Sequence, residues 1–298
     1  MNDNQQPTGT LLDKKELAPK VHRYVFRAPD IARRRKPGQF VIVRTGEGGE
    51  RIPLTIADAD SNRGTVTLVV QEVGRTTAEM ARALEPGMKI ADLVGPLGTP
   101  THIEKYGRVV VVGGGIGVAP VHPIAQAMKA AGNEVIAVIG ARTKELIIME
   151  DEMRAASSRL VVMTDDGSYG AKGFVTDAVK AEAEKGKIDL VVAIGPVPMM
   201  RAVSNLTREL GIPTMVSLNP IMIDGTGMCG GCRVSVGGET KFVCVDGPEF
   251  DGHKVDFDEL VRRQRFYAGE EKSSHETFVE SHTRDPKTCK LLRLADDT

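Results

Sequence analysis

The chain has 298 residues, enough for roughly two or three domains, and its 39 Lys and Arg nearly balance its 40 Asp and Glu. This balance excludes a globally basic nucleic-acid-binding protein, and 4% aromatic residues without any Trp exclude stacking platforms for single strands. No stretch reaches the ~20 consecutive apolar residues of a membrane helix. The N-terminal sequence MNDNQQPTGT also lacks signal-peptide character, so we expect a cytoplasmic protein without nucleic-acid or membrane partners.

Residues 1–104 are predicted to form an all-β domain, either a sandwich or a barrel. Short segments rich in β-branched residues alternate there with turn signals such as KPG and GEGG. The segment Thr76–Leu84 is expected to be a short helix. The expected strands are Val21–Phe26, Gln39–Arg44, Arg51–Ile56 and Gly64–Gln71, with a further strand and turn over Ala91–Gly98.

In residues 105–218, apolar strand patterns alternate with helical patterns. This alternation predicts an α/β domain with a parallel sheet. The expected strands are Arg108–Val112, Glu134–Ile139, Leu160–Thr164, Asp189–Ile194 and Pro213–Leu218. The expected helices are Ile116–Ala131, Lys144–Ala156, Gly173–Lys185 and Val197–Leu210. The boundary with the first domain falls near residues 100–107.

The last part of the chain divides into two segments. Residues 219–255 are rich in Gly, contain three of the four cysteines, and predict one hairpin, from Arg233–Val236 through Gly237-Gly238 to Thr240–Val243. Residues 256–298 are charged and partly helical, and we expect them to be a docking segment for a partner.

A glycine-rich motif, GGGIGVAP, joins the first apolar strand of the α/β domain to a helix. Glycines let the backbone approach a diphosphate closely, and the helix N-terminus that follows favours anions. The candidate nucleotide-binding residues are Gly113, Gly114, Gly115 and Gly117. The alternative is a turn whose glycines only allow the strand and helix to pack. The strand–turn–helix context favours the nucleotide site.

The sequence offers two different partners for the ribose of a dinucleotide. Dinucleotide folds commonly place an acidic residue at the end of the second strand, but this strand ends near Arg142. An arginine there can pair with a 2′-phosphate and favour NADP, or it can be a surface residue. Asp165 and Asp166 follow the next strand and can take ribose hydroxyls instead. NAD and NADP therefore both remain open.

Three cysteines lie in the pattern Asp224-x4-Cys229-x2-Cys232-x11-Cys244. Zinc is one interpretation of the Cys-x2-Cys spacing, but a second such pair is missing. The plant-type pattern of a [2Fe–2S] site, Cys-x4-Cys-x2-Cys with a distant fourth cysteine, matches with Asp224 in the first place. Asp224 can instead be a turn aspartate, and three cysteines with a water ligand also remain possible. Cys289 is expected to be a structural or free thiol.

The order of these motifs resembles that of the ferredoxin-NADP reductase superfamily. RIPLT in the β domain, GGGIGVAP in the α/β domain and the cysteine-rich segment cover roughly residues 8–255. The resemblance is closest to the branch of electron-transfer subunits that carry a C-terminal [2Fe–2S] domain. That branch holds subunits of dihydroorotate dehydrogenase, of sulfide dehydrogenase and of electron-bifurcating NADH-dependent reduced ferredoxin:NADP oxidoreductase. The implied architecture is a β-barrel FAD domain, an α/β parallel-sheet NAD(P) domain and a small [2Fe–2S] domain.

The resemblance also implies roles for individual residues. It places Arg51 on the FAD diphosphate and the hydroxyl of Thr55, the candidate catalytic residue, near the isoalloxazine ring. Ile194 stands where many relatives have a cysteine beside the nicotinamide. The other implied FAD residues are Pro53, Leu54, Gly74, Thr76 and Thr77, and those of the nicotinamide loop are Gly195, Pro196 and Met199.

The cluster pattern with an aspartate departs from the dihydroorotate type, which has four cysteines, and favours the bifurcating or sulfide-dehydrogenase type. By analogy with plant-type clusters, Asp224 and Cys229 would share one iron, and Cys232 and Cys244 the other. A protein of this type moves electrons between NAD(H) or NADP(H), FAD and the cluster.

The expected partner is a larger flavin- and [4Fe–4S]-containing oxidoreductase subunit, with ferredoxin reached through the complex. The alternatives are a dihydroorotate dehydrogenase electron-transfer subunit or, in another class, a zinc-containing nucleotide-binding regulatory protein.

Overall fold

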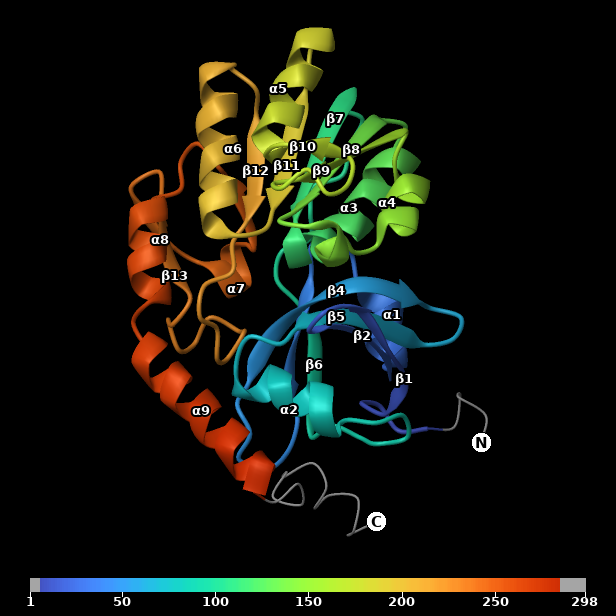
Figure 1. The fold of residues 1–298 in the computed structure, drawn as a ribbon, viewed down its shortest axis with the longest axis vertical. Helices are drawn as coiled ribbons and strands as arrows, with labels where there is room; N and C mark the ends of the chain where they lie inside the picture. Colours follow the sequence, from blue (N-terminus) through green and yellow to red (C-terminus); the bar gives the residue numbers. More distant parts are fainter. Residues whose placement is uncertain (1–5, 285–298) are drawn as a thin grey trace.

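An antiparallel six-stranded sheet, here called the N-terminal sheet, opens the chain in the computed structural model, which describes residues 6–284 (Figure 1). Its buried face is lined by large side chains, among them Tyr24, Phe26 and Leu68. Two helices join it, α1 (Pro29–Arg34) and α2 (Arg75–Ala83). The spatial order is β1-β2-β5-β4-β3-β6, with β1 (Leu11–Ala18), β2 (Val21–Arg27), β3 (Phe40–Arg44), β4 (Ile52–Asp60), β5 (Thr65–Gln71) and β6 (Asp92–Leu97).

A seven-stranded sheet forms the middle of the chain, in the order β10-β9-β8-β7-β11-β12-β15. All neighbours are parallel except β12 and β15, so the predicted parallel sheet gains one antiparallel edge strand. The strands are β7 (Arg108–Gly114), β8 (Glu134–Ala141), β9 (Arg159–Thr164), β10 (Ala171–Lys172), β11 (Leu190–Ile194), β12 (Thr214–Ser217) and β15 (Glu249–Asp251).

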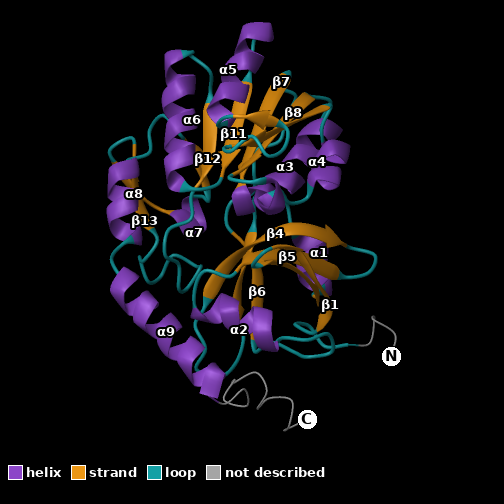
Figure 2. Cartoon of the chain, viewed as in Figure 1, coloured by secondary structure: helices purple, strands orange, loops and turns teal. Residues whose placement is uncertain are grey.

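Helices cover both faces of this sheet (Figure 2). Side chains alternate along β7, so that Val109 and Val111 pack with residues of α3 and α4, whereas Val110 and Val112 pack with residues of α5 and α6. This pattern explains why β7 is a continuous apolar run. The helices are α3 (Val118–Ala130), α4 (Glu150–Ala156), α5 (Val175–Lys185) and α6 (Val197–Glu209).

The cysteine-rich segment and the C-terminal helices lie along one side of both sheets (Figure 1). The predicted hairpin is confirmed, and its two turn residues, Gly237 and Gly238, have φ values of +61° and +83° that favour glycine. The elements are β13 (Arg233–Val236), β14 (Glu239–Phe242), α7 (Val243–Asp246), α8 (Phe257–Gln264) and α9 (Ala268–Arg284).

One hydrophobic core joins the three parts of the chain. Phe40 and Ile42 of β3 belong to the same buried cluster as Cys232, Cys244 and the β7 residue Val112. The cysteine-rich segment therefore packs against both sheets. Among residues 6–284, no helix combines the length and apolar character that crossing a membrane requires.

Some predicted elements were wrong. The helix expected over Lys144–Ala156 is a single 3-10 turn, η3 (Lys144–Leu146), followed by α4, because Met149 takes a left-handed conformation with φ of +53°. Strand β1 was missed because only its two end residues are buried and its middle is charged. Cys289 and the end of the expected docking segment lie outside the described residues.

Candidate functional site

The glycine-rich turn after β7 continues through the 3-10 turn η2 (Gly115–Gly117) into α3. A Cβ at Gly113 would lie 2.8 Å from Cα of Val118, so the strand and helix approach too closely for any side chain. Gly115 has φ of +54° and no heavy atom within 4 Å of where its Cβ would lie. The turn thus needs glycine both for packing and for an open backbone, as phosphate-binding turns do.

The loop after β11 lies directly against this turn. A Cβ at Gly117 would collide with the backbone of Ile194, and one at Gly114 would collide with the sulfur of Met199. Because β7 and β11 are neighbours from which the chain winds in opposite directions, the two loops meet at the switch point of the sheet. Ligands of doubly wound sheets bind at such points. The structure therefore brings the glycine turn together with Gly195, Pro196 and Met199.

The next two strands end in the residues considered for the ribose. Arg142, Asp165 and Asp166 are exposed, and the N–H of Asp166 donates a 3.3 Å hydrogen bond to the carbonyl of Arg142. Hydrogen bonds from the hydroxyl and N–H of Ser168 lower the pKa of Asp166. This edge therefore presents a cation and two carboxylates together.

The strand β4 places Pro53, Leu54 and Thr55 opposite β3, and all three are half-buried. At the start of α2, the hydroxyl of Thr77 accepts hydrogen bonds of 3.0 Å from the N–H groups of Val73 and Gly74. Gly74 has no neighbour within 4 Å of where its Cβ would lie, so this turn is open to a ligand. The hydroxyl of Thr76 is buried and donates to the Glu50 carboxylate.

Arg51 makes a contact that the sequence did not predict. Its Nε donates a 3.1 Å hydrogen bond to the carbonyl of Ile223, the residue before Asp224. Its Nη1 lies 3.6 Å from Oδ2 of Asp92, which also accepts a 2.5 Å hydrogen bond from Arg44. Arg51 thereby joins the start of β4 to the cysteine-rich loop.

Asp224 is held as a carboxylate at the start of that loop. Its Oδ2 accepts hydrogen bonds from the N–H and hydroxyl of Thr226, at 2.9 and 2.7 Å, and from the N–H of Met228, at 3.0 Å. These donors, led by Thr226, lower the pKa of Asp224, and the charge of Arg51 adds to the effect. The charged form is the one that ligates metals.

The cysteines differ in exposure. Cys229 is exposed, and N–H groups of Gly231, at 3.4 Å from Sγ, and of Asp224 lower the pKa of its thiol. Cys232 and Cys244 are buried side by side, and the N–H of Cys244 lies 3.4 Å from Sγ of Cys232. Burial, followed by the contact with Cys232, raises the pKa of Cys244 to about 12. A buried thiol of this kind becomes a thiolate when a metal binds it.

These donors suit a two-iron cluster. Within the part of the chain that the structure describes, no group of three or more His, Cys, Asp or Glu side chains is gathered closely enough to hold a metal ion. The contacts instead form two pairs, Asp224 with Cys229 and Cys232 with Cys244. Amide N–H groups already point at sulfur, and Gly225, Gly227 and Gly230 allow the loop its positive φ angles. We conclude that the residues present fit a [2Fe–2S] cluster.

The C-terminal helices, expected as a docking segment, pack against the rest of the chain. Arg201 of α6 pairs with Asp258 of α8 at 2.7 Å, and the Arg82 guanidinium of α2 lies 5.6 Å from the ring centroid of Phe278. Residues 257–280 thus span from the cysteine-rich segment to α2, beside the N-terminal sheet (Figure 1).

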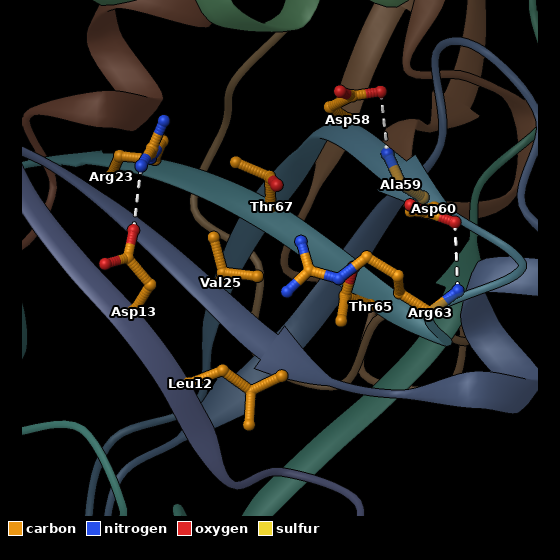
Figure 3. A pocket seen from close by; sticks show the side chains of 10 residues that line it. All are labelled: Leu12, Asp13, Arg23, Val25, Asp58, Ala59, Asp60, Arg63, Thr65 and Thr67. Carbon is orange, nitrogen blue, oxygen red and sulfur yellow. Dashed lines mark hydrogen bonds and ion pairs between the residues drawn. The ribbon is translucent and has the colours of Figure 1, made fainter. Parts of the chain in front are cut away.

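A polar pocket of about 470 Å³ on the N-terminal sheet contains none of the predicted site residues (Figure 3). Arg23 donates to Asp13 at 2.7 Å within the pocket, and Asp58 pairs at 3.4 Å with Arg35 outside it. The side chains that line it are Leu12, Asp13, Arg23, Val25, Asp58, Ala59, Asp60, Arg63, Thr65 and Thr67.

Comparison with family models matches two parts of the chain. Residues 219–256 match the iron-sulfur cluster binding domain of dihydroorotate dehydrogenase B. Residues 111–205 match the oxidoreductase NAD-binding domain. The first match covers Asp224 and the three clustered cysteines, and the second covers the glycine turn and the loop after β11.

Individual proteins match over most of the chain. A Thermotoga maritima protein named dihydroorotate dehydrogenase B (NAD(+)), electron transfer subunit homolog, is 49% identical, over 91% of this chain and 95% of its own. The corresponding Bacillus caldolyticus subunit is 34% identical, over 83% and 96%. A chain from a structure of NADH-dependent reduced ferredoxin-NADP oxidoreductase, studied for flavin-based electron bifurcation, is 48% identical, with a TM-score of 0.87, over 92% and 99%.

Proposed function

We propose that this chain passes electrons between NAD(H), FAD and a [2Fe–2S] cluster within a ferredoxin:NADP oxidoreductase of the bifurcating type. The chain belongs to the oxidoreductase family of dihydroorotate dehydrogenase B electron transfer subunits and their homologues. The fold is ferredoxin-reductase-like with a C-terminal iron–sulfur domain. We take the N-terminal sheet to be the FAD-binding barrel, residues 105–218 the NAD(P) domain and residues 219–255 the cluster domain.

The observation that carries this proposal is the packing of the cysteine-rich loop against the FAD side of the chain. The Nε of Arg51 holds the carbonyl of Ile223, and a Cβ at Gly225 would lie 2.8 Å from the Ile42 side chain of β3. A cluster held by this loop would therefore be a neighbour of a flavin held by β4. Such proximity is what electron transfer between the two requires.

When bound, FAD supplies a two-electron centre that can release electrons singly, and the cluster supplies a one-electron carrier. The chain supplies position and charge. Arg51 and the open turn before α2 are suited to a diphosphate, and the Thr55 hydroxyl lies on the strand that follows Arg51. The glycine turn and the loop after β11 are suited to hold the nicotinamide nucleotide at the switch point, with Ile194 making the site apolar.

We infer a larger partner subunit because related proteins are named electron transfer subunits. The exposed Cys229 marks the side from which such a partner would exchange electrons. A flavin- and [4Fe–4S]-containing subunit that reaches ferredoxin matches the bifurcating type. For the nucleotide we propose NAD(H), with NADP(H) as the competitor that Arg142 would favour.

Cofactor analysis tests the proposal. Anaerobically purified protein should contain one FAD and two irons per chain and absorb in the visible. After dithionite reduction, low-temperature EPR should show one reduced [2Fe–2S] cluster. A colourless protein with stoichiometric zinc after anaerobic purification would overturn the proposal and restore the regulatory alternative.

The second candidate is an electron-transfer subunit of dihydroorotate dehydrogenase. It is favoured by the match of residues 219–256 to the iron–sulfur domain of that enzyme. Copurification of the chain with its native partner separates the two candidates. A partner that oxidises dihydroorotate supports the second, whereas a partner containing [4Fe–4S] clusters and exchanging electrons with ferredoxin supports the first.

A further inference from the structure

The loop that carries the cluster ligands is held at two points by two adjacent residues of α8. Nε2 of Gln264 donates a 2.9 Å hydrogen bond to the carbonyl of Asn219, where the cysteine-rich segment begins. Nη2 of Arg263 donates a 3.2 Å hydrogen bond to the carbonyl of Gly231, which lies between Cys229 and Cys232. The contact from Arg263 thus reaches the part of the loop that contains two of the proposed ligands.

The guanidinium of Arg263 is half-buried without a carboxylate beside it among the described residues. Its Nε is buried and has no hydrogen-bond partner, and among the described residues no carboxylate lies within 4 Å of it as an ion-pair partner. A half-buried cation that faces a carbonyl and lacks a counter-ion is costly. A counter-ion is supplied if the neighbouring cysteines are thiolates that bind a cluster, because the cluster with its thiolates carries a net negative charge.

We propose that Arg263 is a positioning residue of the iron–sulfur site, which holds the Gly231 carbonyl and raises the reduction potential of the cluster through its charge. This inference rests on the proposed function. Reduction adds one negative charge to the cluster, and a nearby cation stabilises the reduced form more than the oxidised form. Removing the cation must therefore lower the potential.

The chain offers a matched control. Arg262 is the neighbouring residue of α8 and carries the same charge, but its side chain is exposed. Because solvent screens an exposed charge, neutralising Arg262 should hardly affect the cluster. Arg263→Lys keeps the charge, so the reduction potential of the cluster should stay close to that of the unaltered protein.

The test is an EPR-monitored redox titration of the purified full-length protein and of its R263Q, R263K and R262Q variants. At a fixed potential, R263Q should lower the ratio of reduced to oxidised cluster about tenfold, which is about 59 mV for one electron. R262Q and R263K should stay within about twofold of the unaltered protein. Raising the salt concentration should leave the effect of R263Q largely unchanged, because the site is partly buried.

Several outcomes decide the matter. An unchanged potential in R263Q, or an equal fall in R262Q, would overturn the inference. Loss of iron from folded R263Q, with its retention in R263K and R262Q, would support it. If the glutamine prevents folding, Arg263→Met, which keeps the packing of the stem, should show the same fall, and an unchanged potential there would overturn the inference. Absence of any cluster signal in the unaltered protein would instead contradict the proposed function itself.

Discussion

Arg51 and Ile223 are 172 positions apart in the chain, yet Nε of Arg51 donates a 3.1 Å hydrogen bond to the carbonyl of Ile223. The first immediately precedes β4, the strand proposed to hold FAD, and the second precedes the proposed cluster ligand Asp224. One side chain therefore links the two proposed redox sites. This link explains how a small cysteine-rich segment keeps a fixed position relative to the N-terminal sheet.

Replacing the aspartate ligand should change the cluster without abolishing it. In Asp224→Cys, a thiolate replaces a carboxylate on one iron and changes the electron density there, so the midpoint potential should shift while the iron content stays at two per chain. EPR-monitored titration measures both. Asp224→Asn, which lacks the charged ligand, should bind less iron. Equal potentials for the unaltered protein and the cysteine variant would contradict ligation by Asp224.

The close packing of the two nucleotide loops predicts the effect of Gly117→Ala. The added Cβ would collide with the backbone of Ile194, so the loops must separate, which costs roughly 1–3 kcal/mol of stability. We expect the dissociation constant for NADH to rise at least about tenfold, as measured by calorimetry. The control is Gly269→Ala on α9, where a Cβ would meet nothing within 4 Å. Unchanged NADH binding in the Gly117 variant would show that this turn does not hold the nucleotide.

Glu249 predicts a pH dependence of stability. Its half-buried carboxylate, on β15, accepts a 2.6 Å hydrogen bond from the hydroxyl of Thr101. Burial raises the pKa of Glu249 from 4.5 to about 7 in the folded protein. Between pH 4.5 and pH 7 the folded state therefore binds more protons than the unfolded state. The protonated Glu249 side chain is compatible with its half-buried position, so its contribution to the stability of the fold is full below pH 4.5 and is lost as the pH rises through 7.

Glu249→Gln removes this dependence. At pH 8 the variant should be more stable than the unaltered protein by on the order of 2–3 kcal/mol, with a smaller difference at pH 5. Urea unfolding at both pH values measures this, and Glu239→Gln on the exposed hairpin is the control. A constant difference between pH 5 and pH 8 would mean that Glu249 does not titrate in this range.

The C-terminal helix α9 should depend on one aromatic side chain. Phe278 is 5% exposed and packs beneath Arg82 of α2, so Phe278→Ala should cost α9 about 3 kcal/mol of local stability. Amide hydrogen exchange in α9 should then speed up by at least about tenfold, while exchange in β7 stays unchanged. Phe266→Ala, at a side chain 74% exposed, should leave both unchanged. Similar exchange in the two variants would mean that α9 is not held by Phe278.

Much of the fold could be predicted because local patterns determine it. Apolar runs such as Arg108–Val112, alternating with amphipathic helices, identified the parallel strands, and Gly237-Gly238 identified the hairpin. The antiparallel strand β15 was missed because three residues carry too little periodicity to distinguish a strand from a loop. The sequence predicts one helix over residues 144–156 because no residue type there indicates that the backbone of Met149 is left-handed.

For the site, the sequence identified which residue types could bind the cofactors but not what holds them. The spacing of Cys229, Cys232 and Cys244 indicated a cluster, and the glycines after β7 indicated a nucleotide turn. The contacts of Arg51 with Ile223 and of Arg263 with Gly231 join segments far apart in the chain. Their sequence context is that of ordinary surface arginines, so only tertiary packing could show their positions.

We propose that one chain carries electrons from a nicotinamide nucleotide to a [2Fe–2S] cluster. The most direct measurement is low-temperature EPR of the anaerobic, oxidised protein after addition of NADH alone, with no dithionite or mediator. A reduced-cluster signal should appear with NADH and should be weaker in the Gly117→Ala variant at limiting NADH. If dithionite reduces the cluster but saturating NADH and NADPH both leave it EPR-silent, the chain does not carry electrons from a nicotinamide nucleotide to the cluster.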